Sequence, residues 1–122
     1  MTIEEVGVLI VDDDRDTCDT LKMLLDLDGY TTWIAADGRA ALALVEQVHP
    51  LCVLIDLNMP GMTGAELTRS IRLAKGDDVV LVAITGSRDS DALNAAEEAG
   101  IDHILTKPVD VAQLQRILPR LV

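Results

Sequence analysis

Polar side chains that could bind a metal ion or accept a phosphoryl group come directly after short apolar runs. Asp12 and Asp13 follow the first run, Asp56 follows another, and Thr85 and Lys107 follow two more. The carboxyl ends of parallel strands meet at one edge of a sheet, where ligands bind, so we expect these five side chains to converge. Clustered carboxylates repel one another unless a cation joins them. The pattern therefore predicts a site for a hard divalent cation.

The ligand types in this set favour Mg²⁺. This ion binds oxygen atoms from one or two carboxylates and fills the rest of its octahedron with water and phosphate oxygens. Zn²⁺ prefers His and Cys ligands, and neither His49 nor His103 has a partner at metal-binding spacing. We interpret both histidines as structural or surface residues and predict Mg²⁺ as the cofactor.

Asp56 is the strongest candidate nucleophile because it stands alone at the end of its run. A carboxylate can attack phosphorus when a metal ion and a cationic side chain neutralise the transferring oxygens. Lys107 offers that positive charge, and Thr85 offers a hydroxyl for a phosphoryl oxygen. Each residue taken singly could also shape a turn, end a strand or be a surface charge. Their joint occurrence favours phosphoryl acceptance by Asp56.

Five apolar runs without polar alternation are typical of parallel strands that are buried on both faces. They cover residues 6–11, 31–35, 51–55, 79–84 and 103–105. The segments between and after them have helical periodicity. Their apolar stripes are Cys18, Leu21, Leu24 and Leu25; Ala41, Leu44, Val45 and Val48; Leu67 and Ile71; Ala92, Ala95, Ala96 and Ala99; and Leu114, Ile117, Leu118 and Leu121.

Helix boundaries are marked by capping residues. Asp14 is predicted to be an N-cap and not a metal ligand, and Gly29 and Gly100 stand where helices end. Two further pairs fit the N-cap and N3 positions: Thr63 with Glu66, and Asp110 with Gln113. The last helical pattern continues to the end of the chain.

Alternating strands and helices with right-handed crossovers predict an α/β fold. We expect a flavodoxin-like, doubly wound (βα)5 domain with a five-stranded parallel sheet in the order 2-1-3-4-5 and helices on both faces. A length of 122 residues fits one domain. Residues 1–122 are therefore predicted to be a single domain without an output domain.

The chain carries ten Lys and Arg against twenty-one Asp and Glu, a net charge of −11, which disfavours binding to nucleic acid and to anionic membranes. Cys18 and Cys52 lie in apolar segments, which predicts buried free thiols. No apolar stretch has the length of a signal peptide core or a membrane span. We expect a cytoplasmic protein.

The chain resembles the response-regulator receiver domains of two-component systems over essentially its whole length. The resemblance rests on four motifs: VLIVDDDRDT, VLIDLNMPGMTG, VAITG and ILTKP. They are similar to the family's acidic pocket, phospho-acceptor loop, hydroxyl-bearing fourth strand and lysine-proline motif.

The resemblance implies a metal site and a phosphorylated aspartate. Asp56 would be phosphorylated, and Mg²⁺ would bind the side chains of Asp13 and Asp56, the backbone carbonyl of Asn58 and, through water, Asp12. Lys107 would contact the phosphoryl group.

The resemblance also implies partners and a switch. Thr85 would turn toward the phosphoryl oxygens on activation, and the Lys107-Pro108 peptide bond would be cis. The phosphoryl donor would be a sensor histidine kinase or a histidine phosphotransfer protein, and a downstream effector or output domain would read the state. Phosphorylation-dependent homodimers are common in the family.

Two residues, Ile104 and Asn58, bear on which function the chain has. Ile104 occupies a place where the family commonly has Tyr or Phe, so the family's aromatic switch cannot operate in the same form; the alternative is a phosphorylation-independent interaction module. Asn58 stands where an aspartate-nucleophile phosphatase needs an acid-base carboxylate. We therefore expect no enzymatic turnover of an outside substrate.

Overall fold

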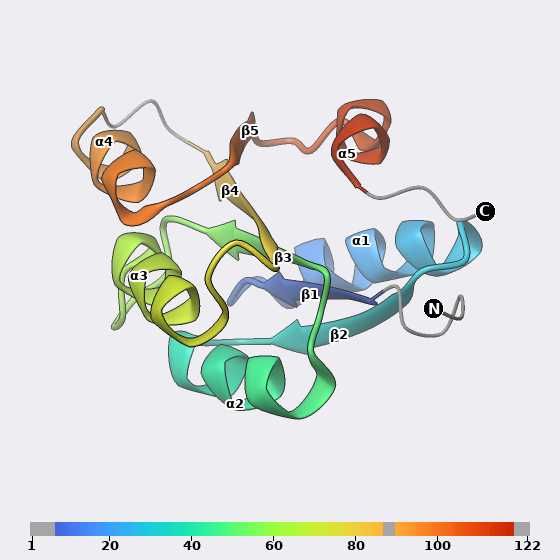
Figure 1. The fold of residues 1–122 in the computed structure, drawn as a ribbon. Helices are drawn as coiled ribbons and strands as arrows, with labels where there is room; N and C mark the ends of the chain where they lie inside the picture. Colours follow the sequence, from blue (N-terminus) through green and yellow to red (C-terminus); the bar gives the residue numbers. More distant parts are fainter. Residues whose placement is uncertain (1–6, 87–89, 119–122) are drawn as a thin grey trace.

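Five parallel strands form the centre of the structure, a computed structural model that describes residues 7–86 and 90–118. The strands lie in the order β2-β1-β3-β4-β5 (Figure 1), which confirms the predicted topology. Their bounds are β1 Gly7–Val11, β2 Thr31–Ala35, β3 Cys52–Asp56, β4 Val80–Thr85 and β5 His103–Thr106.

Helices cover both faces of the sheet (Figure 1). One face packs against α1 and α5, and the other packs against α2, α3 and α4. The helix bounds are α1 Arg15–Leu27, α2 Gly38–Val48, α3 Gly64–Lys75, α4 Ser90–Ala99 and α5 Val111–Ile117. None of these helices is both long and apolar enough to span a bilayer.

The central strands are buried throughout, as apolar runs without alternation predict. Every residue of β1 and β3 is buried, whereas the edge strand β5 buries only Leu105. The predicted runs match the strands to within one residue, and Val6 lies outside the described residues. Asp56 and Thr85 are themselves the last residues of β3 and β4, so the strands deliver them directly to the carboxyl edge.

Most of the predicted caps are confirmed. Asp14 and Thr63 cap α1 and α3, and the Thr63 hydroxyl accepts from the Glu66 N–H at 3.1 Å. Gly29 and Gly100 follow α1 and α4 with positive φ angles of 93° and 114°, which glycine adopts at little cost.

The start of α5 was predicted correctly, but its end was not. Asp110 is the N-cap and Gln113 is the third helical residue, and the Asp110 carboxylate accepts from the N–H of Ala112. The helix ends at Ile117, with Leu118 in extended backbone, because Pro119 disfavours helical geometry in the residue before it. Leu121 lies outside the described residues.

Arg72 joins three segments at the amino-terminal edge of the sheet. Its guanidinium donates to the carbonyls of Gly76 (2.8 Å), Val79 (2.7 Å) and Gly100 (2.8 and 3.0 Å), and to the Asp102 carboxylate at 2.6 Å. One side chain of α3 thereby fixes the loop before β4 and the loop between α4 and β5.

Replacing Arg72 with Met is expected to lower the free energy of unfolding by about 2–3 kcal/mol, because several carbonyls lose a charged donor together. Urea unfolding measures the change. Arg69→Met, at an exposed position of the same helix, is the matched control and should change stability by less than about 0.5 kcal/mol. Equal effects of the two variants would contradict the structural role of Arg72.

Cys18 and Cys52 are free, buried thiols, as predicted. Burial raises the pKa of Cys18 to about 11, assisted by Asp12 and Asp14, and burial raises the pKa of Cys52 to about 12. Because the thiolate is the reactive form, both thiols should react with a disulfide reagent at pH 8 at least about 100-fold more slowly in the folded than in the unfolded chain. Rapid labelling of either thiol in the folded protein would contradict this.

Candidate functional site

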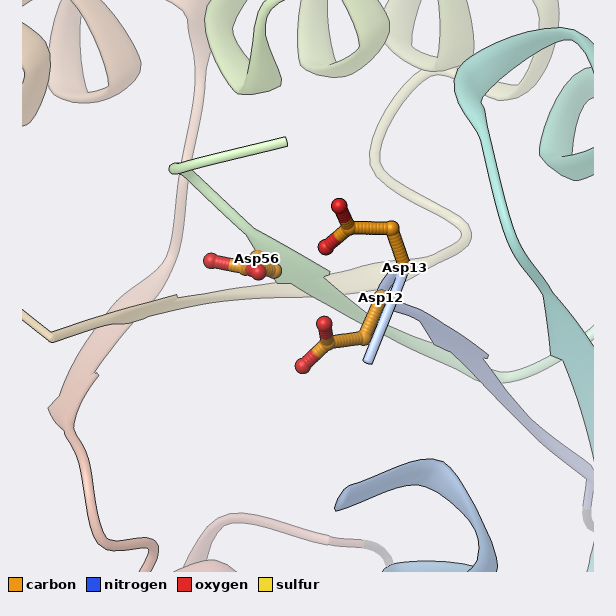
Figure 2. Close-up of side chains that lie close together, drawn as sticks. All are labelled: Asp12, Asp13 and Asp56. Carbon is orange, nitrogen blue, oxygen red and sulfur yellow. The ribbon is translucent and has the colours of Figure 1, made fainter. Parts of the chain in front are cut away.

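Three carboxylates meet at the carboxyl edge of the sheet (Figure 2). Asp12 and Asp13 follow β1, and Asp56 ends β3, the strand that pairs in parallel with β1. One ligand oxygen from each residue lies within 4.8 Å of the others. The convergence predicted from the strand ends is confirmed for these residues, because neighbouring parallel strands end side by side.

The three carboxylates differ in burial. Asp12 and Asp56 are each 3% exposed, whereas Asp13 is exposed. Burial raises the pKa of Asp12, and the neighbouring Asp56 raises it further, against the opposing effects of the Asp14 N–H and of Lys107. The folded chain therefore holds a carboxylate whose charged form is destabilised, which a bound cation would relieve.

Replacing Asp12 with Asn is expected to stabilise the metal-free protein at pH 7 by about 1 kcal/mol, because it removes a desolvated charge beside Asp56. Urea unfolding in a chelator measures this, with the exposed Asp19→Asn as the control.

The sign of the pH dependence follows from the raised pKa. Asp12 contributes stability when it is protonated, and that contribution is lost as pH rises through its folded pKa. The advantage of Asp12→Asn should therefore shrink as pH falls toward 3.8, the ordinary value for Asp. An advantage that does not change with pH would contradict the assignment to this carboxyl.

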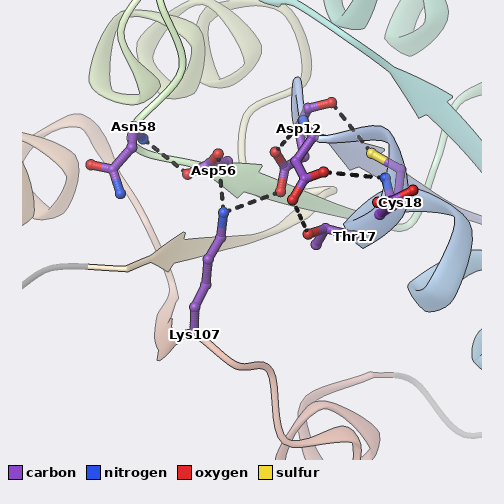
Figure 3. Close-up of polar contacts among 8 residues, drawn as sticks. Asp12, Thr17, Cys18, Asp56, Asn58 and Lys107 are labelled. Carbon is purple, nitrogen blue, oxygen red and sulfur yellow. Dashed lines mark hydrogen bonds and ion pairs between the residues drawn. The ribbon is translucent and has the colours of Figure 1, made fainter.

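Lys107 lies between the two buried carboxylates (Figure 3). Its Nζ is 3.4 Å from Oδ2 of Asp12 and 3.3 Å from Oδ2 of Asp56. Burial alone would lower the pKa of Lys107, but the charges of Asp56 and Asp12 outweigh that effect and raise it. Lys107 is therefore a fixed positive charge, and the peptide bond to Pro108 is cis, as the resemblance implied.

Two backbone N–H groups orient the buried carboxylates, and no sequence motif had predicted them. The Asn58 N–H donates to Oδ1 of Asp56 at 3.0 Å, and the Asp14 N–H donates to Oδ1 of Asp12 at 2.9 Å. Both contacts span two residues, the pattern of an Asx-turn. Asp residues at the strand ends were the sequence feature from which these Asx-turns could have been predicted. The Cys18 thiol also donates to the Asp12 carbonyl, at 3.3 Å.

Thr85 and Ile104 lie around this centre. Thr85 ends β4, is 2% exposed, and follows Ile84, which pairs with Asp56 across the sheet. Ile104 is half-buried and packs against a small cluster of Leu57, Ala83 and Ala96 beneath α4. The structure thus brings Thr85 to the same edge as the carboxylates and places Ile104 in the packing of α4.

The donor set fits a metal ion. Lys107 is the cation that contacts Asp12 and Asp56, and a single ammonium leaves a group of three carboxylates negatively charged. An oxygen-only set of this kind suits a hard divalent cation. Asp12, Asp13 and Asp56 therefore fit a metal site.

Comparisons with known proteins agree on one family. The family model described as response regulator receiver domain matches residues 8–119. An uncharacterized 14.6 kDa protein in the sodA1 3′ region of Leptolyngbya boryana is 36% identical over 118 residues, which cover 96% of this chain and 90% of that protein.

Two further similarities are to a response regulator and to a receiver domain protein of known structure. Response regulator MprA of Mycolicibacterium vanbaalenii is 36% identical over 109 residues, 89% of this chain but 47% of MprA, so the chain spans about half the length of this relative. The crystal structure of a CheY-like receiver domain protein from Methanospirillum hungatei JF-1 superposes with a TM-score of 0.86 at 30% identity, covering 91% of this chain and 88% of that one.

The family model covers nearly the whole described fold, and the acidic cluster lies where the parallel strands end. The chain belongs to the response regulator receiver domain family.

Proposed function

We propose that this chain is a phospho-accepting receiver domain, in which Asp56 takes a phosphoryl group with the help of Mg²⁺ and thereby shifts the domain to an active signalling conformation. One observation carries the proposal: Asp56 is buried at a strand end, among two further carboxylates, and in contact with the Lys107 ammonium.

Mg²⁺ would be held by the side chains of Asp13 and Asp56, by the backbone carbonyl of Asn58 and, through water, by Asp12. When bound, the ion would neutralise negative charge on the phosphoryl oxygens and on the carboxylates. The site residues would hold it in place without a His or Cys ligand.

The transfer itself uses Asp56 as the nucleophile. A carboxylate oxygen of Asp56 forms a bond to phosphorus while the bond from phosphorus to the donor nitrogen of a phosphohistidine breaks, and the imidazole leaves with the bonding electron pair. Lys107 contacts Asp56 and would neutralise charge on the phosphoryl oxygens. Later attack of water on the acyl phosphate releases inorganic phosphate and restores the Asp56 carboxylate. The phosphorylated species is the domain itself, and we expect no enzymatic turnover of an outside substrate.

Thr85 would carry the signal away from the site by turning its hydroxyl toward a phosphoryl oxygen. The shift in population depends on how much more strongly the phosphoryl group binds one state than the other. Because Ile104 is aliphatic and packs beneath α4, the readout would depend on repacking of that apolar cluster and not on an aromatic rotamer.

The donor would be a sensor histidine kinase or a histidine phosphotransfer protein. A largely apolar pocket of about 540 Å³ beside Lys107 supports a docking site between α1 and the start of α5. Its lining includes Thr17, Thr20, Leu21, Leu24, Pro108 and Val109. A partner seated there could bring its phosphohistidine to the adjacent carboxylates.

We further propose that residues 1–122 act as one receiver unit, read by a downstream effector or output domain or through a phosphorylation-dependent homodimer. The net charge of −11 disfavours direct binding of this domain to nucleic acid. Two buried free thiols are consistent with the reducing conditions of the cytoplasm.

Intact mass after incubation with a small acyl-phosphate donor tests the proposal. We expect the wild-type chain to gain one phosphoryl group only with Mg²⁺, Asp56→Asn to gain none, and the exposed control Asp19→Asn to behave as wild type. No gain in the wild type would overturn the proposal and favour the phosphorylation-independent interaction module that Ile104 suggests.

A further inference from the structure

The side chains of β5, the strand that precedes Lys107, do little to fix its register in the sheet. Strand β5 has four residues at the edge of the sheet; His103 and Thr106 are exposed, and only Leu105 is buried. Its neighbour Ile104 is also apolar and points to the opposite face. A slip by one residue would exchange one aliphatic side chain for the other, so hydrophobicity specifies the register of β5 poorly.

Asp102, directly before β5, makes a contact that only one register allows. Its N–H donates to the Leu81 carbonyl at 2.9 Å, and its carboxylate Oδ2 accepts from the Leu81 N–H at 2.8 Å. Backbone ladder bonds are chemically alike in every register, whereas this second bond requires a side-chain acceptor at one position. Asp102 therefore distinguishes the observed register from its neighbours.

Arg72 fixes Asp102 from α3. Its guanidinium donates at 2.6 Å to the same Oδ2 and also binds the carbonyl of Gly100, two residues earlier. The Arg72 side chain is 15% exposed and is itself tied to the carbonyls of Gly76 and Val79. The Asp102 carboxylate is thus held between a half-buried guanidinium and β4.

We propose that Asp102, held by Arg72, is a positioning residue for phosphoryl acceptance, because it sets the register that brings Lys107 to Asp12 and Asp56. A one-residue slip moves a strand by about 3.3 Å. That displacement is as large as the 3.3 and 3.4 Å contacts of the Lys107 ammonium. The proposal rests on the proposed function of Lys107.

The other end of β5 does not replace this restraint. The Lys107 N–H donates to the Thr85 carbonyl at 2.8 Å, a backbone bond that a shifted strand could make to a different carbonyl. The metal ligands, by contrast, follow β1 and β3 and do not depend on β5. Loss of the Asp102 contact should therefore affect Lys107 and spare metal binding.

Because the position of Lys107 depends on β5 and the metal ligands do not, phosphorylation rate and Mg²⁺ affinity can be tested separately. In the full chain, Asp102→Ala should lower the rate constant for phosphorylation by acetyl phosphate at saturating Mg²⁺ by about tenfold or more, as displacement of a positioned group does. Its Mg²⁺ dissociation constant, measured by calorimetry, should not rise above the wild-type value, because the carboxylates keep their strands and the displaced Lys107 ammonium no longer competes with the ion. Asp102→Asn keeps an acceptor for the Leu81 N–H and should restore most of the rate.

A control separates positioning from loss of stability. Val45→Ala removes buried contacts of α2, far from β5, and should destabilise the chain without changing the phosphorylation rate at a temperature where it remains folded. The proposal is overturned if Asp102→Ala has the wild-type rate, or if its Mg²⁺ affinity falls in parallel with its rate.

The register can also be measured without phosphorylation. Cross-strand proton contacts in NMR spectra should show the wild-type pairs Ala83 with Ile104 and Ile84 with Leu105, and Asp102→Ala should weaken or shift them. Unchanged pairs would overturn the inference even if the wild-type chain accepted no phosphoryl group. Failure of the proposed function and failure of this inference are therefore separate results.

Discussion

Replacing Lys107 with Met will slow phosphorylation of Asp56 by at least about 100-fold, because a preorganised charge at a transferring group is worth several kcal/mol. Lys107 contacts Oδ2 of both Asp12 and Asp56, and Met keeps the apolar stem while removing the ammonium. The rate is followed by intact mass with a small acyl-phosphate donor at saturating Mg²⁺.

The Mg²⁺ affinity of Lys107→Met should rise although its phosphorylation rate falls. Removing Lys107 leaves the carboxylates without their nearby cation, so the ion should bind more tightly to Lys107→Met than to the wild type. Lys75→Met, at a lysine on α3 that contacts His49 and not the acidic cluster, is the control and should change neither quantity. A wild-type rate in Lys107→Met would remove the lysine from the mechanism.

Removing Mg²⁺ with a chelator will reduce phosphorylation by about 1,000-fold, since the ion neutralises charge that the protein cannot balance alone. Asp13 permits a matched test because it is the exposed member of the acidic cluster. Asp13→Asn should need much more Mg²⁺ to reach half of the maximal rate, whereas the exposed Asp16→Asn should not. Phosphorylation that continues in excess chelator would contradict a metal-dependent mechanism.

The sequence was sufficient to predict the sheet because its signals are local and repeated. Each apolar run lies within one residue of a strand, and right-handed crossovers between parallel strands leave few topologies for five βα units. The convergence of Asp12, Asp13 and Asp56 followed from that topology. The end of α5 was predicted wrongly because the apolar spacing was given more weight than the restriction that Pro119 places on Leu118.

Contacts between distant segments were not predictable in the same way. Arg72 binds Gly100 and Asp102, which are 28 and 30 residues away along the chain, and no periodicity or capping pattern links them. The backbone N–H groups that donate to the carboxylates also depend on tertiary geometry. The resemblance implied only that the Asn58 carbonyl binds the metal, whereas in the structure the Asn58 N–H donates to Asp56. Local patterns determined the elements and the site residues, whereas tertiary structure determined the contacts that orient them.

Chemical trapping of the phosphorylated residue tests the central claim most directly. Borohydride reduces an aspartyl phosphate to homoserine, which peptide mass spectrometry can locate after the chain has been incubated with acetyl phosphate and Mg²⁺. We predict homoserine at position 56 and at no other aspartate, with none in Asp56→Asn or in the presence of chelator. Homoserine at Asp12 or Asp13, or its absence from a chain that has gained a phosphoryl group, would contradict the assignment of Asp56 as the acceptor.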